Sequence, residues 1–148
     1  MIKINKDQEK KLIQAALVGI KNAFTGTNKP DDFRIGAAVL TKKGNIYSSG
    51  HYYSDTYSLT LHVEQAVLAH AAAHGEYGIV AIAITGNGAI GPDDSIYPCH
   101  MCKQLLWESY LRSKENTKII MLDEKGNVLE RINLLDTINY PWPKEPKR

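Results

Sequence analysis

The feature that most constrains this chain is a pair of short motifs, each placed where a helical pattern begins. The first is His62-Val63-Glu64 and the second is Pro98-Cys99-His100-Met101-Cys102. Imidazole nitrogen and thiolate sulfur are preferred zinc donors, and a catalytic zinc takes three protein ligands and leaves its fourth position open. A fold that uses these motifs together must therefore bring two helix starts to one point.

The two cysteines of the chain are spaced for one metal. A spacing of three residues places the sulfurs of Cys99 and Cys102 on one face of a helical turn. The positive end of a helix favours the thiolate, which is the form that binds metal. We therefore predict one Zn²⁺ per chain, held by His62, Cys99 and Cys102. Two thiolates and a neutral imidazole balance the charge of Zn²⁺, so no cationic side chain is needed at the position after Glu64. The neutral Gln65 agrees with this charge balance; alternatively, it is an ordinary helix residue.

Glu64 poses a geometric requirement. In a regular helix, side chains two positions apart, such as those of His62 and Glu64, point about 200° apart. Both reach one site only if His62 stands at the helix entrance, before helical geometry begins. Glu64 then serves as a proton shuttle and not as a ligand, taking a proton from the attacking water and delivering it to a ring nitrogen. The pattern H-x-E followed by P-C-x-x-C is typical of zinc deaminases.

Other interpretations of the cysteine pair remain open. A Cys-x-x-Cys pair also occurs in redox sites, although that reading leaves His62, Glu64 and Pro98 without a role. A closed structural zinc site needs a fourth ligand. The remaining histidines are the candidates for it: His51, His70, His74 and His100. Of these, His70 and His74 are four apart in an alanine-rich segment, which favours a place on the helix surface.

Composition narrows the class of partner. The length of 148 residues allows one domain, residues 1–148. The formal net charge is only +2, and the basic residues form no stripe along the sequence. This argues against a nucleic-acid partner and favours a small-molecule substrate. No apolar run reaches the length of a membrane span, and the first residues lack the apolar core of a signal peptide. We expect a cytoplasmic protein with no membrane partner, in agreement with cysteines spaced for metal in a reducing compartment.

The hydrophobic periodicity predicts the element order α-β-β-α-β-α-β-β. Helices are expected over residues 6–24, 61–74 and 99–111, and strands over residues 33–40, 46–53, 78–85, 118–122 and 128–129. A loop is expected over residues 86–97. This order implies an α/β fold with a mixed sheet and helices on both of its faces.

Nearly the whole chain resembles the cytidine deaminase family. Members show a Phe-x-Val-Gly-Ala-Ala strand, a Cys- or His-x-Glu helix start and a Pro-Cys-x-x-Cys segment, which match residues 33–38, 62–64 and 98–102. The resemblance implies a three-layer α/β/α sandwich with about five strands, and hydrolysis of cytidine or deoxycytidine to the uridine form with release of ammonia. It also implies that Phe33 walls the base pocket, that the Val63 backbone bonds the pyrimidine and that Glu64 moves the proton. For so short a chain it implies a homo-oligomer with composite active sites, a tetramer in preference to a dimer.

One departure from the family concerns the sugar. The family's ribose-binding Asn-x-Glu segment falls on His51-Tyr52-Tyr53, so an imidazole and a phenol replace a carboxamide and a carboxylate. Both groups still form hydrogen bonds, which makes His51 and Tyr53 candidate substrate-binding residues; the alternative is that they fill surface at a strand end. Loss of a paired polar contact disfavours the substrate that needs it. A modified nucleoside or another aminopyrimidine compound, as in the blasticidin deaminase branch, is therefore the alternative substrate.

Smaller departures leave further alternatives. Tyr97 stands where many family members have a small or hydroxyl residue, and His100 stands where they have a glycine. Each side chain either narrows the mouth of the substrate pocket or faces solvent. The segment Tyr140-Pro141-Trp142-Pro143 either caps a neighbouring subunit's site or packs in the ordinary way. Two other functions are a non-catalytic member that keeps zinc as a structural pin and a deaminase of nucleic acid. Glu64 argues against the first, and the weak net charge argues against the second.

Overall fold

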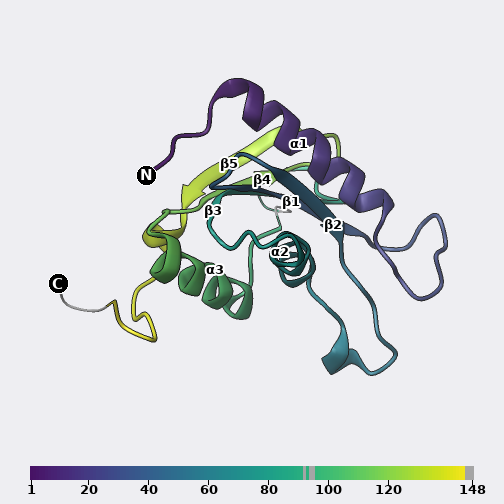
Figure 1. Cartoon of the computed structure of the whole chain (residues 1–148). Coiled ribbons are helices and arrows are strands. Elements are labelled where there is room, and N and C mark those ends of the chain that lie inside the picture. Colours follow the sequence, from purple (N-terminus) through teal and green to yellow (C-terminus); the bar gives the residue numbers. More distant parts are fainter. Residues whose placement is uncertain (92, 94–95, 146–148) are drawn as a thin grey trace.

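A mixed five-stranded sheet forms the centre of the molecule, as the computed structural model shows for residues 1–91, 93 and 96–145 (Figure 1). The sheet order is β2-β1-β3-β4-β5. Strands β3 and β4 are parallel, and the other neighbours are antiparallel. The strands are β1 (Ile35–Thr41), β2 (Ile46–Gly50), β3 (Ile79–Gly86), β4 (Lys118–Leu122) and β5 (Val128–Asn133).

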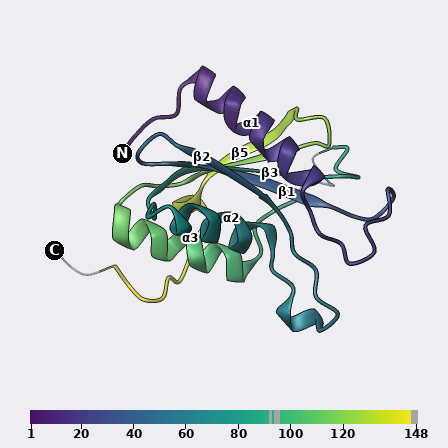
Figure 2. The same ribbon diagram turned by 45° about the vertical axis from the view of Figure 1, so that its right-hand side comes forward.

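Helices cover both faces of this sheet. Figures 1 and 2 show α1 (Lys6–Lys21) on one face, and α2 (Val63–Ala73) with α3 (His100–Ser113) on the other. Each face has its own apolar core, with Leu12 and Ala16 of α1 on one side and Val67 and Leu106 of α2 and α3 on the other. The predicted three-layer α/β/α sandwich is confirmed. None of the helices in the described part of the chain is long and apolar enough to cross a bilayer.

Two glycines let α1 lie directly against the strands. A Cβ atom at Gly36 would lie 2.3 Å from the backbone nitrogen of Ile20, and one at Gly50 would lie 2.3 Å from the Cα atom of Ala23. Any side chain at these positions meets the backbone of α1 or of the residues just after it, and backbone has no rotamer by which to move aside. The glycine of the residue 33–38 motif is therefore explained by packing on the face of the sheet that α1 covers.

Several predicted boundaries were wrong, because tertiary pairing ends or extends the elements. Helix α1 stops at Lys21 and not Phe24, since the N–H of Phe24 donates to the carbonyl of His51. Strand β2 stops at Gly50 and not at residue 53, and α2 begins at Val63 and not at residue 61, because Tyr52 pairs with Phe24 and Leu61 instead. Strand β5 continues past residue 129 to Asn133 because it pairs with β4 along its length.

Smaller shifts of one or two residues affect the other ends. Strands β1 and β3 begin at Ile35 and Ile79, later than the predicted residues 33 and 78, and α3 runs on to Ser113. Two short 3₁₀ helices, η1 (Tyr57–Leu59) and η3 (Leu134–Thr137), were not predicted. The predicted loop 86–97 lies partly outside the described residues, at positions 92, 94 and 95.

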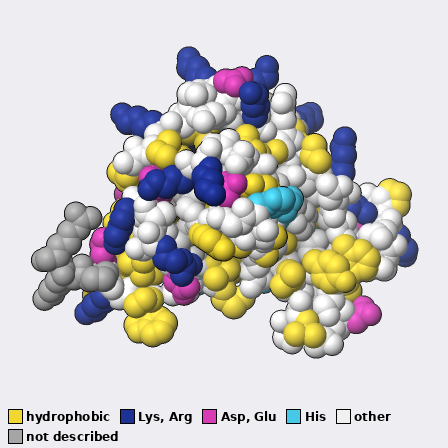
Figure 3. All heavy atoms as spheres, viewed as in Figure 1, with side chains coloured by type: hydrophobic (Ala, Val, Ile, Leu, Met, Phe, Trp, Pro, Cys, Tyr) yellow, Lys and Arg dark blue, Asp and Glu magenta, His cyan; other side chains and the backbone are white. Residues whose placement is uncertain are grey.

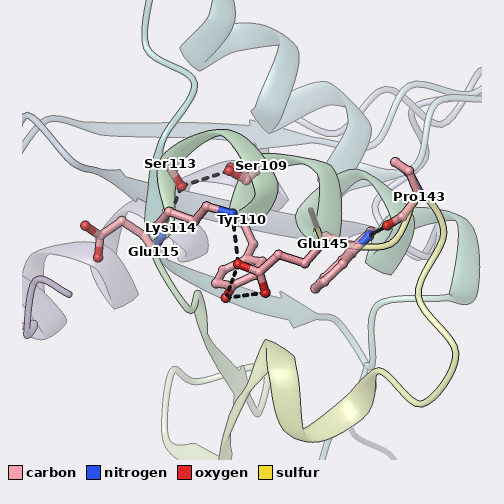
Figure 4. A network of polar contacts seen from close by, with 8 residues as sticks. Ser109, Tyr110, Ser113, Lys114, Glu115, Pro143 and Glu145 are labelled. Atoms are coloured by element: carbon pink, nitrogen blue, oxygen red, sulfur yellow. Dashed lines mark hydrogen bonds and ion pairs between the residues drawn. The ribbon is translucent and has the colours of Figure 1, made fainter. Parts of the chain in front are cut away.

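The C-terminal segment runs along α3 of its own chain (Figure 4). The Trp107 Nε1–H donates to the carbonyl of Pro143 at 2.9 Å, and Lys114 Nζ lies 2.9 Å from a Glu145 carboxylate oxygen. The side chains of Tyr140 and Trp142 remain 99% and 75% exposed. The main chain of this tail is thus attached to α3, while its two large aromatic rings stay accessible.

Candidate metal centre

The start of α2 meets the geometric requirement set by Glu64. His62 is the N-cap residue, with φ −61° and ψ 151°, and the helix begins at Val63. His62 Nδ1 and Glu64 Oε2 both approach Cys102 Sγ, so the two side chains face the same side of the helix entrance. The Gln65 side chain accepts a hydrogen bond from the backbone N–H of His62 at 2.8 Å. Gln65 therefore has a capping role that was not considered among the sequence-based expectations.

The start of α3 brings both cysteines to His62. Cys99 is the N-cap of α3 and Cys102 lies in its first turn. The two Sγ atoms lie 3.4 Å apart, and each lies 3.4 Å from His62 Nδ1. A tetrahedral zinc with ligand distances of about 2.0–2.3 Å separates its donor atoms by roughly 3.5–3.8 Å. The three side chains therefore fit a metal of this kind.

Among the residues that the structure describes, this is the one group of three or more histidine, cysteine or acidic side chains arranged to hold a metal ion, with all three donor atoms within 4.8 Å of one another. His70 and His74 are exposed on α2 and pack against the ring of Tyr47, and His100 is exposed at the start of α3. None of these three histidines joins the cluster.

Glu64 lies beside the cluster in a buried position. Its side chain is 4% exposed, and its Oε2 atom lies 3.3 Å from Cys102 Sγ. Burial raises the pKa of the Glu64 carboxyl group. Burial and the neighbouring Glu64 carboxylate raise the pKa of the Cys102 thiol far above its usual range. A dication compensates this concentration of acidic groups, and a coordinated thiol loses its proton outright.

A cavity of about 220 Å³ opens beside these residues. Three of the four predicted substrate-binding residues, Phe33, His51 and Val63, line this cavity together with Glu64. Tyr97 lines it too, and its hydroxyl donates to the Glu130 carboxylate. The lining residues that sequence reasoning missed are Ile35, Thr60, Leu61 and Ile96. Ile35 lies within the residue 33–38 motif and Leu61 is next to His62, so their positions carried a signal, whereas the residue types of Thr60 and Ile96 are those of ordinary loop and core positions.

A hydrogen bond from β1 selects one tautomer of the His51 ring. Its Nδ1 accepts a hydrogen bond from the backbone N–H of Ile35 at 3.2 Å. A ring nitrogen that accepts from an N–H carries no proton, so the neutral ring keeps its hydrogen on Nε2 as a donor. Burial lowers the pKa of His51, in agreement with a neutral ring. A fourth-ligand role through Nδ1 would require this hydrogen bond to break.

Tyr53 is not brought to the cavity. Its ring lies against Gly26, where an added Cβ would come within 2.6 Å of the ring, and it contacts Tyr57 edge to face at a centroid distance of 6.1 Å. Its backbone N–H donates to the carbonyl of Phe24 at 2.9 Å. Substrate binding by Tyr53 therefore stays a prediction, without a contact in this chain that supports it.

Comparison with known proteins agrees with this geometry. The family model for the cytidine and deoxycytidylate deaminase zinc-binding region matches residues 6–114. A cytidine deaminase from Halalkalibacterium halodurans is 26% identical over 119 residues, which cover 80% of this chain and 83% of the relative.

Solved structures agree with the fold. Cytidine deaminase from Burkholderia pseudomallei matches with a TM-score of 0.74 at 24% identity, covering 90% of this chain and 98% of that one. Cytidine deaminase from Mycobacterium tuberculosis matches with a TM-score of 0.67 at 22% identity, covering 91% of this chain and 97% of that one. At such identities the structural matches establish the fold alone, and the family match is what extends to the zinc-binding region.

Proposed function

Because the chain belongs to the cytidine and deoxycytidylate deaminase family, and is therefore a zinc-dependent hydrolytic deaminase, we propose that it acts on cytidine, deoxycytidine or a close analogue. Water adds to the ring carbon that bears the exocyclic amine, and the amine leaves as ammonia to give the uridine form. One observation carries this proposal: the His62, Cys99 and Cys102 donor atoms and the buried Glu64 meet beside a cavity of about 220 Å³.

We assign one zinc per chain to His62 Nδ1 and to the Sγ atoms of Cys99 and Cys102. The donor separations of 3.4 Å and the helix-start positions support this assignment. When bound, zinc supplies a nucleophile at neutral pH by acidifying water. The two helix N-termini contribute partial positive charge, which stabilises the thiolates of the proposed ligands.

Glu64 moves the protons of the reaction. Its carboxylate takes a proton from the attacking water, passes it to the ring nitrogen next to the reacting carbon, and then assists departure of the amine. Burial supports this role, because it raises the pKa of the Glu64 carboxyl group and so helps this group to hold a proton between the two transfers. Its place beside Cys102 and along the cavity wall puts it within reach of a ring bound there.

The cavity wall provides the binding groups. The Phe33 ring offers an apolar surface to the base, the Val63 backbone bonds the pyrimidine edge, and His51 donates a hydrogen bond through Nε2. The names of the relatives favour cytidine over a blasticidin-type substrate. A role for Tyr53 in sugar binding belongs to the same proposal, although in this chain that residue stands outside the cavity wall.

We further propose a homo-oligomer, with a tetramer favoured over a dimer. Large apolar side chains are exposed on the segment between β2 and α2 and beside it: Phe24, Tyr52, Tyr57, Leu59 and Leu61. Figure 3 shows hydrophobic side chains at the surface at the lower right, where Figure 1 places this segment. Contiguous exposed apolar surface of this kind is typical of protein interfaces. Light scattering after size-exclusion chromatography tests the proposal, and a monomer at micromolar concentration contradicts it.

The Glu64→Gln variant tests the catalytic proposal. The amide keeps the shape of the carboxylate but cannot carry the proton, so kcat for cytidine should fall by at least about 10²–10⁴-fold. Zinc content and melting temperature should stay near those of the native protein. The assay is ammonia release from cytidine, deoxycytidine, cytosine, methylated cytosines and blasticidin.

Glu76→Gln is the matched control. Glu76 is also a buried glutamate, but it lies beyond the far end of α2, where it accepts hydrogen bonds from Thr41, Asn45 and Tyr47. Its replacement should leave turnover per folded molecule unchanged. Near-native activity of Glu64→Gln would refute the proton-shuttle role, and a native protein without activity on any of these compounds would refute the proposed substrates.

A further inference from the structure

The carboxamide of Asn87 binds the main chain on both sides of Phe33. Its Oδ1 accepts the backbone N–H of Arg34 at 2.6 Å, and its Nδ2 donates to the backbone carbonyl of Asp32 at 2.7 Å. The backbone N–H of Asn87 also donates to the carbonyl of Arg34 at 3.1 Å. One residue thus contributes three hydrogen bonds around a single cavity residue.

This arrangement extends the sheet beyond the end of β3. The last regular pair of β1 and β3 is Ile35 with Gly86, and Gly88 turns the chain away with φ +90°. The Asn87 side chain takes the place of the peptide group that a longer β3 would have supplied, since a carboxamide offers the same acceptor and donor pair. The sheet ladder therefore reaches Phe33 although the strand itself does not.

Phe33 depends on such support because it lies at the end of an irregular segment. Its ring lines the cavity and is 59% exposed, so packing covers only part of it. The preceding loop is bonded within itself: the Arg34 guanidinium donates to the carbonyls of Lys29 and Asp32. The bonds of the Arg34 side chain hold the loop in its own shape. The two bonds of the Asn87 side chain instead attach the loop to the end of β3, one on either side of Phe33.

We propose that Asn87 is a positioning residue, which holds the Phe33 ring in the place where it contacts the substrate base. This inference rests on the proposed function for the role of Phe33 as a base-binding wall. The bonds fix the main chain at residues 32 and 34, so the Phe33 side chain starts from one backbone position. Without them the loop is free to shift, and the ring must be ordered each time the substrate binds.

The composition of the chain allows a direct test that needs no catalysis. Phe24 and Phe33 are its only phenylalanines. Protein labelled with para-fluorophenylalanine therefore gives two fluorine NMR signals, which Phe24→Leu and Phe33→Leu assign. Asn87→Ala should shift or broaden the Phe33 signal and leave the Phe24 signal, whose ring stacks on Tyr52, in place.

Asn127→Ala is the matched control. The Asn127 carboxamide also binds a turn, donating to the Asp123 carboxylate at 2.8 Å, and it lies between β4 and β5, away from the residues that line the cavity. This variant should change neither fluorine signal. An unchanged Phe33 signal in Asn87→Ala would overturn the inference.

Kinetics on cytidine then separates positioning from general stability. Asn87→Ala should raise KM about tenfold, the effect of two modest hydrogen bonds, with kcat and zinc content nearly unchanged. In a Phe33→Leu background the same substitution should have little further effect on KM, because the ring that it positions is gone. An equal rise in KM in both backgrounds would also overturn the inference.

The two proposals can fail separately. If the native protein converts none of the cytidine compounds, the proposed function is wrong, and the fluorine spectra still decide whether Asn87 positions Phe33. If cytidine is converted and the Phe33 fluorine signal is the same in native protein and in Asn87→Ala, the proposed function stands and the positioning role is refuted.

Discussion

Replacing Gly36 by alanine should destabilise the protein without altering its chemistry. The added Cβ would lie 2.3 Å from the backbone nitrogen of Ile20, 2.5 Å from the carbonyl oxygen of Ala16 and 2.7 Å from the carbonyl carbon of Gly19. All three atoms belong to the backbone of α1. The clash is therefore relieved only by moving the helix away from the sheet.

The size of the effect follows from these distances. An ordinary carbon contact is about 3.5 Å or more, so α1 must move by roughly 1 Å, and overpacking of this kind typically costs about 1–3 kcal/mol. Alanine also reduces the freedom of the unfolded chain, which offsets about 0.4–1 kcal/mol. The net loss is about 1–2 kcal/mol, which corresponds to a fall in melting temperature of roughly 3–6 °C for a chain of this length.

The assay is thermal unfolding of the zinc-loaded protein, with kcat measured on the folded fraction. Gly91→Ala is the control, because among the described residues, its chain neighbours aside, no atom lies within 4 Å of a Cβ at Gly91, and Gly91 is not among the glycines with positive φ. The kcat value should persist in both variants, since α1 covers the face of the sheet opposite α2 and α3. A Gly36→Ala variant as stable as Gly91→Ala would refute the reasoning.

Three further predictions concern the ligands, the sugar and the loop before β1. Cys102→Ala should lose bound zinc by metal analysis, and full occupancy would exclude the ligand assignment. The double substitution His51→Asn and Tyr53→Glu should raise kcat/KM for cytidine relative to a substrate without ribose hydroxyls, by about 1–3 kcal/mol of transition-state energy; a fall in that ratio would show that the native pair already binds sugar. Hydrogen bonds from Thr25 and Thr27 lower the pKa of Asp32 from 3.8 to about 2, so its stabilising effect is present above about pH 4 and is lost as the pH falls toward 2. The gap in melting temperature between native protein and Asp32→Asn should accordingly narrow as the pH falls from 5 to 2, with most of the narrowing below about pH 4, and a constant gap would contradict this.

The clustering of His62, Cys99 and Cys102 was predictable because its signals are local. Cysteines three apart at a helix start, and a histidine followed by a glutamate, restrict geometry within a few residues of each position. The family resemblance was confirmed for the same reason, since its motifs are short and lie at the ends of elements. The order of helices and strands followed from periodicity alone.

The features that the sequence did not predict depend on contacts between residues far apart in the chain. Asn87 has the residue type of an ordinary turn, and only the end of β1 beside it makes its carboxamide a partner for the loop before Ile35. Tyr53 was expected at the site because the family's ribose-binding segment falls on residues 51–53, yet Tyr52 pairs with Phe24 and Leu61, and Tyr53 is not among the residues that line the cavity. Such placements depend on strand pairing, which no window of a few residues contains.

The parallel pairing of β3 and β4 has a consequence for synthesis on the ribosome. The connection between two parallel strands must cross a face of the sheet, and here α3 makes that crossing. A nascent chain that ends just after Cys102 contains every proposed ligand. It lacks most of α3, and it also lacks β4, which shares the apolar core with α3. We therefore expect the site to assemble only after β4, at residues 118–122, has left the exit tunnel. Until then the connection between β3 and β4 is incomplete, and we expect the thiols of Cys99 and Cys102 to be accessible to oxidants.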